Sequence, residues 1–173
     1  MTMINEQNNH RQHPVADLID GAIAGAIATW VMGKATSYLY EHENKAARTR
    51  ENDVRGGQTA YGVAAEKGAR LAGTQLSKDE RQRYGSAIHW ALGIGAGALY
   101  GLVRDRAPGA GLARGLLFGA AFWLFMDEGA NWALGLTPGP TEFPWQTHVR
   151  GLAGHLVYGT VADATVAALQ PGA

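Results

Sequence analysis

The feature that most constrains the fold is a set of four apolar segments, each close to the length of a membrane-spanning helix. The segments cover residues 17–38, 86–104, 111–133 and 148–169. A helix needs about 20 mostly apolar residues to cross the hydrocarbon core of a bilayer. Each segment also carries at least one ionisable side chain. Length therefore allows four crossings, while composition leaves a soluble helical bundle as the alternative.

Three further patterns favour the membrane over a soluble bundle. The segments are apolar on almost all sides, whereas a soluble surface helix has one charged face. Glycine recurs in all four segments, although in water it costs a helix about 1 kcal/mol relative to alanine. Tryptophan and tyrosine gather near the segment ends, where membrane proteins place interfacial anchors. We therefore predict an integral membrane four-helix bundle, with the lipid bilayer as its partner.

The rest of the chain divides into a polar tail, a charged region and short links. Residues 1–14 are polar and are expected to form a tail, and residues 15–173 are expected to form a single membrane domain. The charged region 41–84 contains an amphipathic stretch, 59–76, which predicts an additional helix between helices one and two. Strand-like alternation is poor throughout, so the fold class is all-α. The expected membrane helices run over about 15–40, 86–104, 111–136 and 148–169.

The distribution of basic residues bears on orientation. Region 41–84 carries nine lysines and arginines, against three in the compact connection 104–114 on the opposite side. Basic residues near the ends of spanning helices favour the cytoplasmic side. Both regions satisfy this rule in part, and the counts favour a cytoplasmic position for 41–84.

Small residues recur at four-residue spacing in every segment, which places them on one helix face and lets helix backbones approach closely. The rows are Asp17-Gly21-Gly25-Thr29-Gly33, His89-Gly93-Gly97-Gly101, Gly111-Gly115-Gly119 and Gly151-His155-Gly159-Asp163-Ala167. Three rows contain ionisable residues, and two more steps along the third row reach Asp127. The packed faces are therefore expected to be the polar faces as well. The rows exceed what four helices need for themselves, so we predict a homo-oligomer, with no further protein partner identified.

The pair Asp127-Glu128 directly follows the most hydrophobic run of the chain, FWLFM at 122–126. A third helix that ended before this pair would have about 15 residues, too few to cross a bilayer. A longer helix would bury at least one acid, which is costly unless the charge finds water, a partner or a proton. We expect the helix to continue, with Asp127 facing the packed interior and Glu128 at the edge.

Ionisable residues inside the segments are candidates for a proton or ion relay. Such residues are expensive in lipid and face the bundle interior, and histidine titrates in the mildly acidic range. The preferred arrangement is a buried pair between His155 and a carboxylate of the third helix. Asp17 could instead serve the positive end of the helix dipole, and His89 could make an interhelical hydrogen bond. The candidate relay residues are His89, Asp127, Glu128, His155, Asp163 and Asp17.

Composition and motifs argue against several other classes of function. The chain has no cysteine, which excludes disulfide and thiol chemistry. Its net charge of zero gives no sign of nucleic-acid binding. Nucleotide-binding and hydrolase motifs are missing, so we expect no enzymatic activity and no cofactor. His148 and His155 are seven residues apart on one face and could share a metal, but two ligands are a poor indication and no metal site is predicted.

Two stretches resemble a known family. HWALGIGAGALYG at 89–101 and the pattern GLTP…FPW…GHL, at 135–138, 143–145 and 154–156, are similar to the YagU-like family of small bacterial inner-membrane proteins. The resemblance extends from about Val15 onward and is clearest in the last 90 residues. It implies a multi-helix inner-membrane protein associated with acid resistance, with no catalytic residues to carry over. The matching positions are Gly135, Pro138, Pro144, Trp145, Gly154 and His155.

Two functions are compatible with these patterns. In the first, the chain is a multi-pass inner-membrane protein that handles protons or ions through the candidate relay residues. In the second, it is a structural or scaffold membrane protein that forms a homo-oligomer without transport activity. The same buried polar groups would then only fix the register of the helices.

Overall fold

The computed structural model describes residues 14–106 and 112–171, and the residues it describes form helices and links without any strand. The all-α prediction is confirmed for this part of the chain. The tail expected at 1–14 lies outside the described residues, except for Pro14, which begins the first helix. Three described helices are long and apolar enough to cross a membrane: α1 (Pro14–Glu41), α4 (Lys78–Val103) and α7 (Trp145–Leu169). The chain therefore has the character of a membrane protein.

The third apolar segment, 111–133, is helical but not uniform over its described residues. α5 (Leu112–Trp123) passes into a π-helix of seven residues, η2 (Leu124–Ala130), and then into the short α6 (Asn131–Ala133). The backbone keeps right-handed helical angles at both junctions. The helical path thus continues past Asp127 and Glu128, and both acids lie in the π-helical turns. Such turns are rare in proteins and are frequent at functional sites.

The charged region 41–84 contains two short helices. α2 (Lys45–Arg55) begins after Asn44, whose side chain accepts the backbone N–H of Ala46, and ends at Gly56 in the left-handed conformation. α3 (Ala60–Leu71) lies within the stretch 59–76 that was expected to be helical. α2 was not predicted, because its sequence KAARTRENDVR is too polar to show an apolar face.

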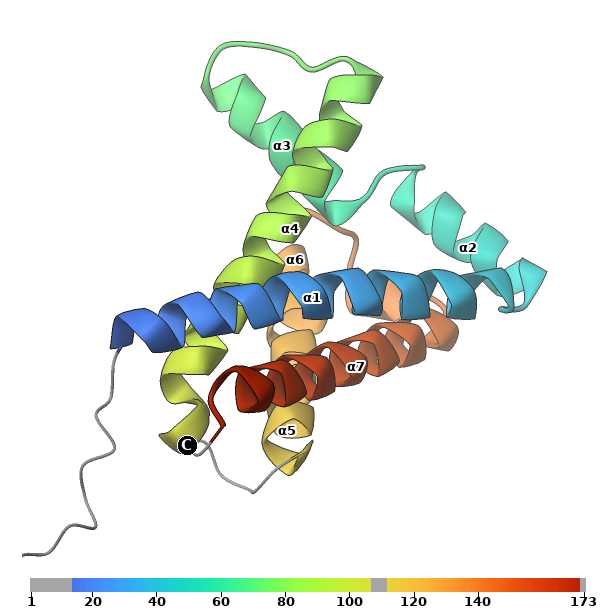
Figure 1. Ribbon diagram of the computed structural model, residues 1–173. Helices are drawn as coiled ribbons and strands as arrows, with labels where there is room; N and C mark the ends of the chain where they lie inside the picture. The colour runs from blue at the N-terminus through green and yellow to red at the C-terminus, as the bar shows by residue number, and fades with distance from the viewer. Residues whose placement is uncertain (1–13, 107–111, 172–173) are drawn as a thin grey trace, which may run out of the picture.

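Helices α1 and α7 lie side by side and run in opposite directions, while α4 crosses α1 and the α5–α6 segment crosses α7 (Figure 1). α3 packs against the first half of α4, and together they project from this body (Figure 1). The buried core where the long helices meet is small. It consists of Ala24, Ala28, Tyr100, Tyr158, Ala162 and Val166.

Large apolar side chains point outward along the long helices. Examples are Ile23 and Ile27 of α1, Leu99 of α4, Leu117 of α5 and Val149 of α7, all exposed. Soluble monomers rarely expose contiguous apolar patches of this extent. Small residues inside and large apolar residues outside is an arrangement that suits lipid rather than water.

Glycines bring the helix backbones into direct contact at the crossings. A Cβ added to Gly25 of α1 would lie 2.6 Å from the carbonyl oxygen of Gly93 and 3.0 Å from the Cα of Gly97, both in α4. At the crossing of α5 and α7, a Cβ on Gly115 would meet the backbone of Gly159. Real Cβ atoms do not approach backbone so closely, so these crossings require glycine.

The α1–α4 crossing provides a test of this packing. We expect Gly97→Ala to destabilise the protein by about 1–3 kcal/mol, because its Cβ would lie 2.6 Å from the backbone nitrogen of Gly25. Thermal unfolding in detergent, followed by tryptophan fluorescence, measures the effect. The matched control is Gly95→Ala, whose Cβ meets nothing within 4 Å and whose helix propensity improves. Equal melting of the two variants would contradict the close crossing.

Candidate functional site

A cavity of about 1000 Å³ lies between the first half of α4, the π-helix η2 and the first half of α7, with α2 and its link to α3 on a further side. Its volume is at the upper end of the range for small-molecule sites. Four candidate relay residues line it together: His89, Asp127, Glu128 and His155. The other ionisable lining residues are Glu51, Arg55, Tyr61, Lys78, Arg81, His148 and Arg150.

The shortest histidine–carboxylate contact in the cavity joins η2 to α7. His148 Nδ1 lies 2.6 Å from Glu128 Oε1, and His148 Nε2 lies 3.1 Å from the carbonyl oxygen of Pro140. Both ring nitrogens therefore face acceptors, and a ring that carries two protons satisfies both. This contact also attaches the proline-rich link after α6 to the cavity wall.

A second histidine–carboxylate pair lies deeper along α7. His155 Nδ1 is 3.0 Å from the carbonyl oxygen of Gly151 and 3.7 Å from Asp127 Oδ2. The nearer oxygen takes the Nδ1 hydrogen bond, so Asp127 is a charge partner of the ring rather than a hydrogen-bond acceptor. The ring of Phe122 contacts His155 edge to face, with centroids 5.1 Å apart. The pair therefore borders the apolar interior on one side and the cavity on the other.

The two adjacent acids do not divide between interior and edge as expected. The side chain of Asp127 is 32% exposed and that of Glu128 is 18% exposed, so the predicted order was wrong. Both residues line the cavity. The π-helix has more residues per turn than an α-helix, so consecutive side chains point in more similar directions. His148 then covers Glu128 and leaves Asp127 the more open of the two.

Several buried polar atoms of the cavity wall have no partner within the described part of the chain. They are Arg81 Nε, Trp123 Nε1, Asn131 Oδ1 and Thr147 Oγ1. Buried polar groups in folded proteins are nearly always hydrogen-bonded to protein or to ordered water. Four such atoms around one cavity indicate that the cavity holds water or a polar ligand.

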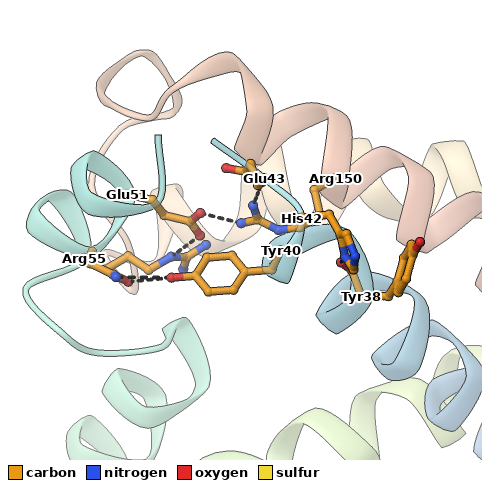
Figure 2. Close-up of polar contacts among 8 residues, drawn as sticks. Tyr38, Tyr40, His42, Glu43, Glu51, Arg55 and Arg150 are labelled. Carbon is orange, nitrogen blue, oxygen red and sulfur yellow. Dashed lines mark hydrogen bonds and ion pairs between the residues drawn. The ribbon is translucent and has the colours of Figure 1, made fainter. Parts of the chain in front are cut away.

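Arg150 of α7 connects α2 to the body of the protein. Its guanidinium binds Glu43, just after α1, and Glu51 of α2, and it lies 4.9 Å from the centre of the Tyr40 ring (Figure 2). Glu51 also accepts a hydrogen bond of 2.9 Å from Arg55 (Figure 2). We call Glu43, Glu51, Arg55 and Arg150 the Arg150 cluster. No helix among those described packs extensively against α2, so side-chain contacts hold it: this cluster, the hydrogen bonds between Asn52 and Tyr40, and the stacking of Arg55 on Phe143.

The charge state of Glu51 depends on this cluster. Burial raises the pKa of the Glu51 carboxyl, but the hydrogen bond from Arg150 and the charges of Arg55 and Arg150 outweigh burial, and the pKa lies below its usual value. The folded cluster therefore favours the ionised carboxylate. At neutral pH its pairing with Arg150 holds α2 against the cavity.

The structure places Asp163 outside the cavity. Its Oδ1 accepts hydrogen bonds from the hydroxyl of Tyr100 at 2.7 Å and from Nε of Arg104 at 2.8 Å. A chain of ring contacts leads from Asp163 back to His155 through Tyr100, Phe118, Tyr158 and Phe122. Asp163 therefore forms an ion pair with Arg104, and aromatic side chains separate this pair from the cavity.

The remaining candidates have different surroundings. Asp17 accepts a hydrogen bond of 3.1 Å from Gln170, near the end of α7 and away from the cavity. His89 faces the cavity, and its ring packs against the ring of Tyr61 with centroids 5.1 Å apart. Within residues 14–106 and 112–171, no group of three or more histidines and acids is placed to hold a metal ion.

Sequence reasoning missed several residues of the cavity wall. Arg150 is an arginine in the first turns of an apolar segment, and this could have marked it as one half of an ion pair. Asn131 lies one helical turn beyond Asp127, which could have placed it on the same face. No sequence signal pointed to Glu51, because its partner Arg150 is 99 positions away.

Comparison with known proteins gives one match. Residues 60–164 match the family described as "Protein of unknown function (DUF1440)". The chain belongs to this family. The match spans α3 to most of α7 and so includes most of the cavity wall, whereas Glu51 and Arg55 precede it. No curated protein and no solved structure matches the chain.

The attachment of α2 through Glu51 can be tested by substitution. Glu51→Gln removes a buried charge-assisted contact, which is worth about 1.5–3 kcal/mol. We expect amide hydrogen exchange in α2 to become at least tenfold faster in the detergent-solubilised protein, while exchange in α7 stays slow. The control is Asp53→Asn, which changes an exposed acid of the same helix. Unchanged exchange in Glu51→Gln would show that α2 is held by other contacts.

Acidification should release α2 in the wild type. The pKa of Glu51 is lower in the folded protein than its ordinary value of 4.5. The stabilisation is therefore complete above about pH 4.5 and is lost as the pH falls through the lower folded value. Hydrogen exchange in α2, corrected for the intrinsic effect of pH, should accelerate in this acidic range in wild type and much less in Glu51→Gln. A parallel loss of protection in α7 would instead indicate global unfolding.

Proposed function

We propose that this is a multi-pass protein of the bacterial inner membrane, with α1, α4, the α5–α6 segment and α7 in the bilayer. α3 is the additional amphipathic helix, and region 41–84 faces the cytoplasm. The exposed apolar side chains along all four segments support this arrangement. The glycine-rich faces suit a homo-oligomer. Recovery of the protein in the soluble fraction without detergent would instead establish a soluble bundle.

We further propose that the protein handles protons or ions through the cavity. The observation that carries this proposal is that two histidine–carboxylate pairs, His148–Glu128 and His155–Asp127, line the same cavity between η2 and α7. Histidine is the side chain that changes charge between pH 5 and 8. Protonation of either ring therefore alters the charge balance between two helices. The resemblance to the YagU-like family adds the association with acid resistance.

The proposed relay has two parts. The first part is the set of cavity residues that exchange protons with one another, which are His89, Asp127, Glu128 and His155. The second part is Asp163, which lies beyond the aromatic cluster, and Asp17, which lies near the end of the same bundle. The hydroxyl of Tyr158 donates to the carbonyl oxygen of Gly93 at 2.6 Å, and this contact occupies the space between the two parts. Transfer through the protein therefore requires the aromatic side chains to move.

The alternative is a structural or scaffold protein without transport. The observation that favours it is the Asp163–Arg104 ion pair, which is buried and also hydrogen-bonded to Tyr100. Such a pair fixes α4 against α7 without any proton exchange. Buried polar groups then specify helix register, as in other proteins where they select a single packing arrangement.

Flux measurements in liposomes separate the two functions. We expect wild-type protein to conduct protons or monovalent cations, and His155→Ala and Asp127→Asn to reduce the flux at least tenfold, because each removes one member of a cavity pair. Asp53→Asn, outside the cavity, should behave as wild type. Size-exclusion chromatography checks that the variants keep the assembly of the wild type. Absence of flux in the wild type, with both variants dissociating, would support the scaffold.

A further inference from the structure

One corner of the cavity gathers polar atoms that have no hydrogen-bond partner among the described residues. Asp127 Oδ2 and Trp123 Nε1 would each lie 3.0 Å from a Cβ placed on Gly151, so both atoms converge on the bare backbone of that glycine. Asn131 is only 5% exposed, and its Oδ1 is buried without a partner among the described residues. Thr147 Oγ1, one turn before Gly151, is likewise unpartnered. All of these residues line the cavity.

Most charged groups of the cavity wall lie close to a group of opposite charge, and Asp127 at this corner is the exception. The compensated groups are Glu51 with Arg55 and Arg150, Glu128 with His148, and Arg81 with Glu66. Lys78 is exposed at the start of α4. Asp127 alone among the lining acids has no side-chain hydrogen bond within the described residues, and His155 lies 3.7 Å from it. An acid beside two unpartnered oxygen atoms favours a ligand that brings positive charge and N–H donors.

We propose that this corner binds a protonated organic amine, whose ammonium group donates hydrogen bonds to Asp127 and to Asn131 Oδ1. The ring of Trp123 borders this corner at Gly151, and the ring of Tyr61 lines the same cavity. Aromatic faces attract organic cations, and the attraction grows when the cation leaves water. The carboxylate of Asp127 supplies the negative charge, and the buried amide oxygen of Asn131 orients the ammonium group by accepting one of its hydrogen bonds.

The size of the cavity favours an organic cation over a bare metal ion. A volume of about 1000 Å³ accommodates a small organic molecule, and the part of the chain that the structure describes offers no cluster of three metal-binding side chains. Gly151 keeps the corner open, because a side chain there would press on Asp127 and Trp123. The inference rests on the proposed function in one respect, because the amine binds the carboxylate of Asp127, which is also a member of the proposed relay.

Calorimetric titration of the full chain in detergent tests the proposal with three probes of one shape. Benzylammonium is a cation at neutral pH, benzyl alcohol is neutral and benzoate is an anion. We expect benzylammonium to bind the wild type at least tenfold more tightly than either of the others. Asp127→Asn should weaken that binding at least tenfold, whereas Asp53→Asn should bind as the wild type does.

Gly151→Ala provides a second variant that leaves every charge in place. Its methyl group would fill the corner and displace the side chains of Asp127 and Trp123, so we expect weaker benzylammonium binding by a protein that still shows a cooperative thermal unfolding transition. Three outcomes would each overturn the proposal. They are tighter binding of benzoate than of benzylammonium, benzylammonium binding that is unchanged in Asp127→Asn, and no binding of any probe. Binding at equilibrium needs no transport, so amine binding without liposome flux would overturn the proposed proton handling alone. Flux without amine binding would overturn only the amine site.

Discussion

The arrangement of this protein depends on the contact of helix backbones at glycine. At the crossings of α1 with α4 and of α5 with α7, glycine faces glycine, and no side chain larger than hydrogen fits. Close approach of this kind replaces the interdigitated side chains of a soluble core with backbone van der Waals contact. Large apolar side chains are consequently displaced to the outer surface. A lipid environment accommodates them there, whereas water would not.

The ionisable groups of the bundle divide between two places. At one end, Tyr100 and Arg104 both donate hydrogen bonds to Asp163 Oδ1. At the other end, the Arg150 cluster closes over a cavity in which Asp127 has only a distant partner. Asp127 therefore differs from the other lining acids, because Glu51 and Glu128 each accept a side-chain hydrogen bond and Asp127 accepts none among the described residues.

Local patterns in the sequence were sufficient to predict the long apolar helices and α3, but not α2. Apolar length and four-residue spacing are properties of a single segment, and they identified both the all-α class and the faces that carry Gly25 and Gly97. Long-range pairing is not local, and the predictions failed or were silent there. The ion pair of Asp163 with Arg104 was not predicted, because the two residues are 59 positions apart. α2 was not predicted because its polar sequence shows no apolar face, and its contact with Arg150 through Glu51 spans 99 positions.

The π-helix between α5 and α6 connects the fold to the chemistry of the cavity. π-Helical turns are rare and are frequent at functional sites, and η2 lines the cavity. Asp127 and Glu128 both lie in this π-helix and both line the cavity. Glu128 contacts His148 at 2.6 Å, whereas Asp127 has His155, at 3.7 Å, as its charge partner. These different partners on α7 make the two adjacent carboxylates chemically different.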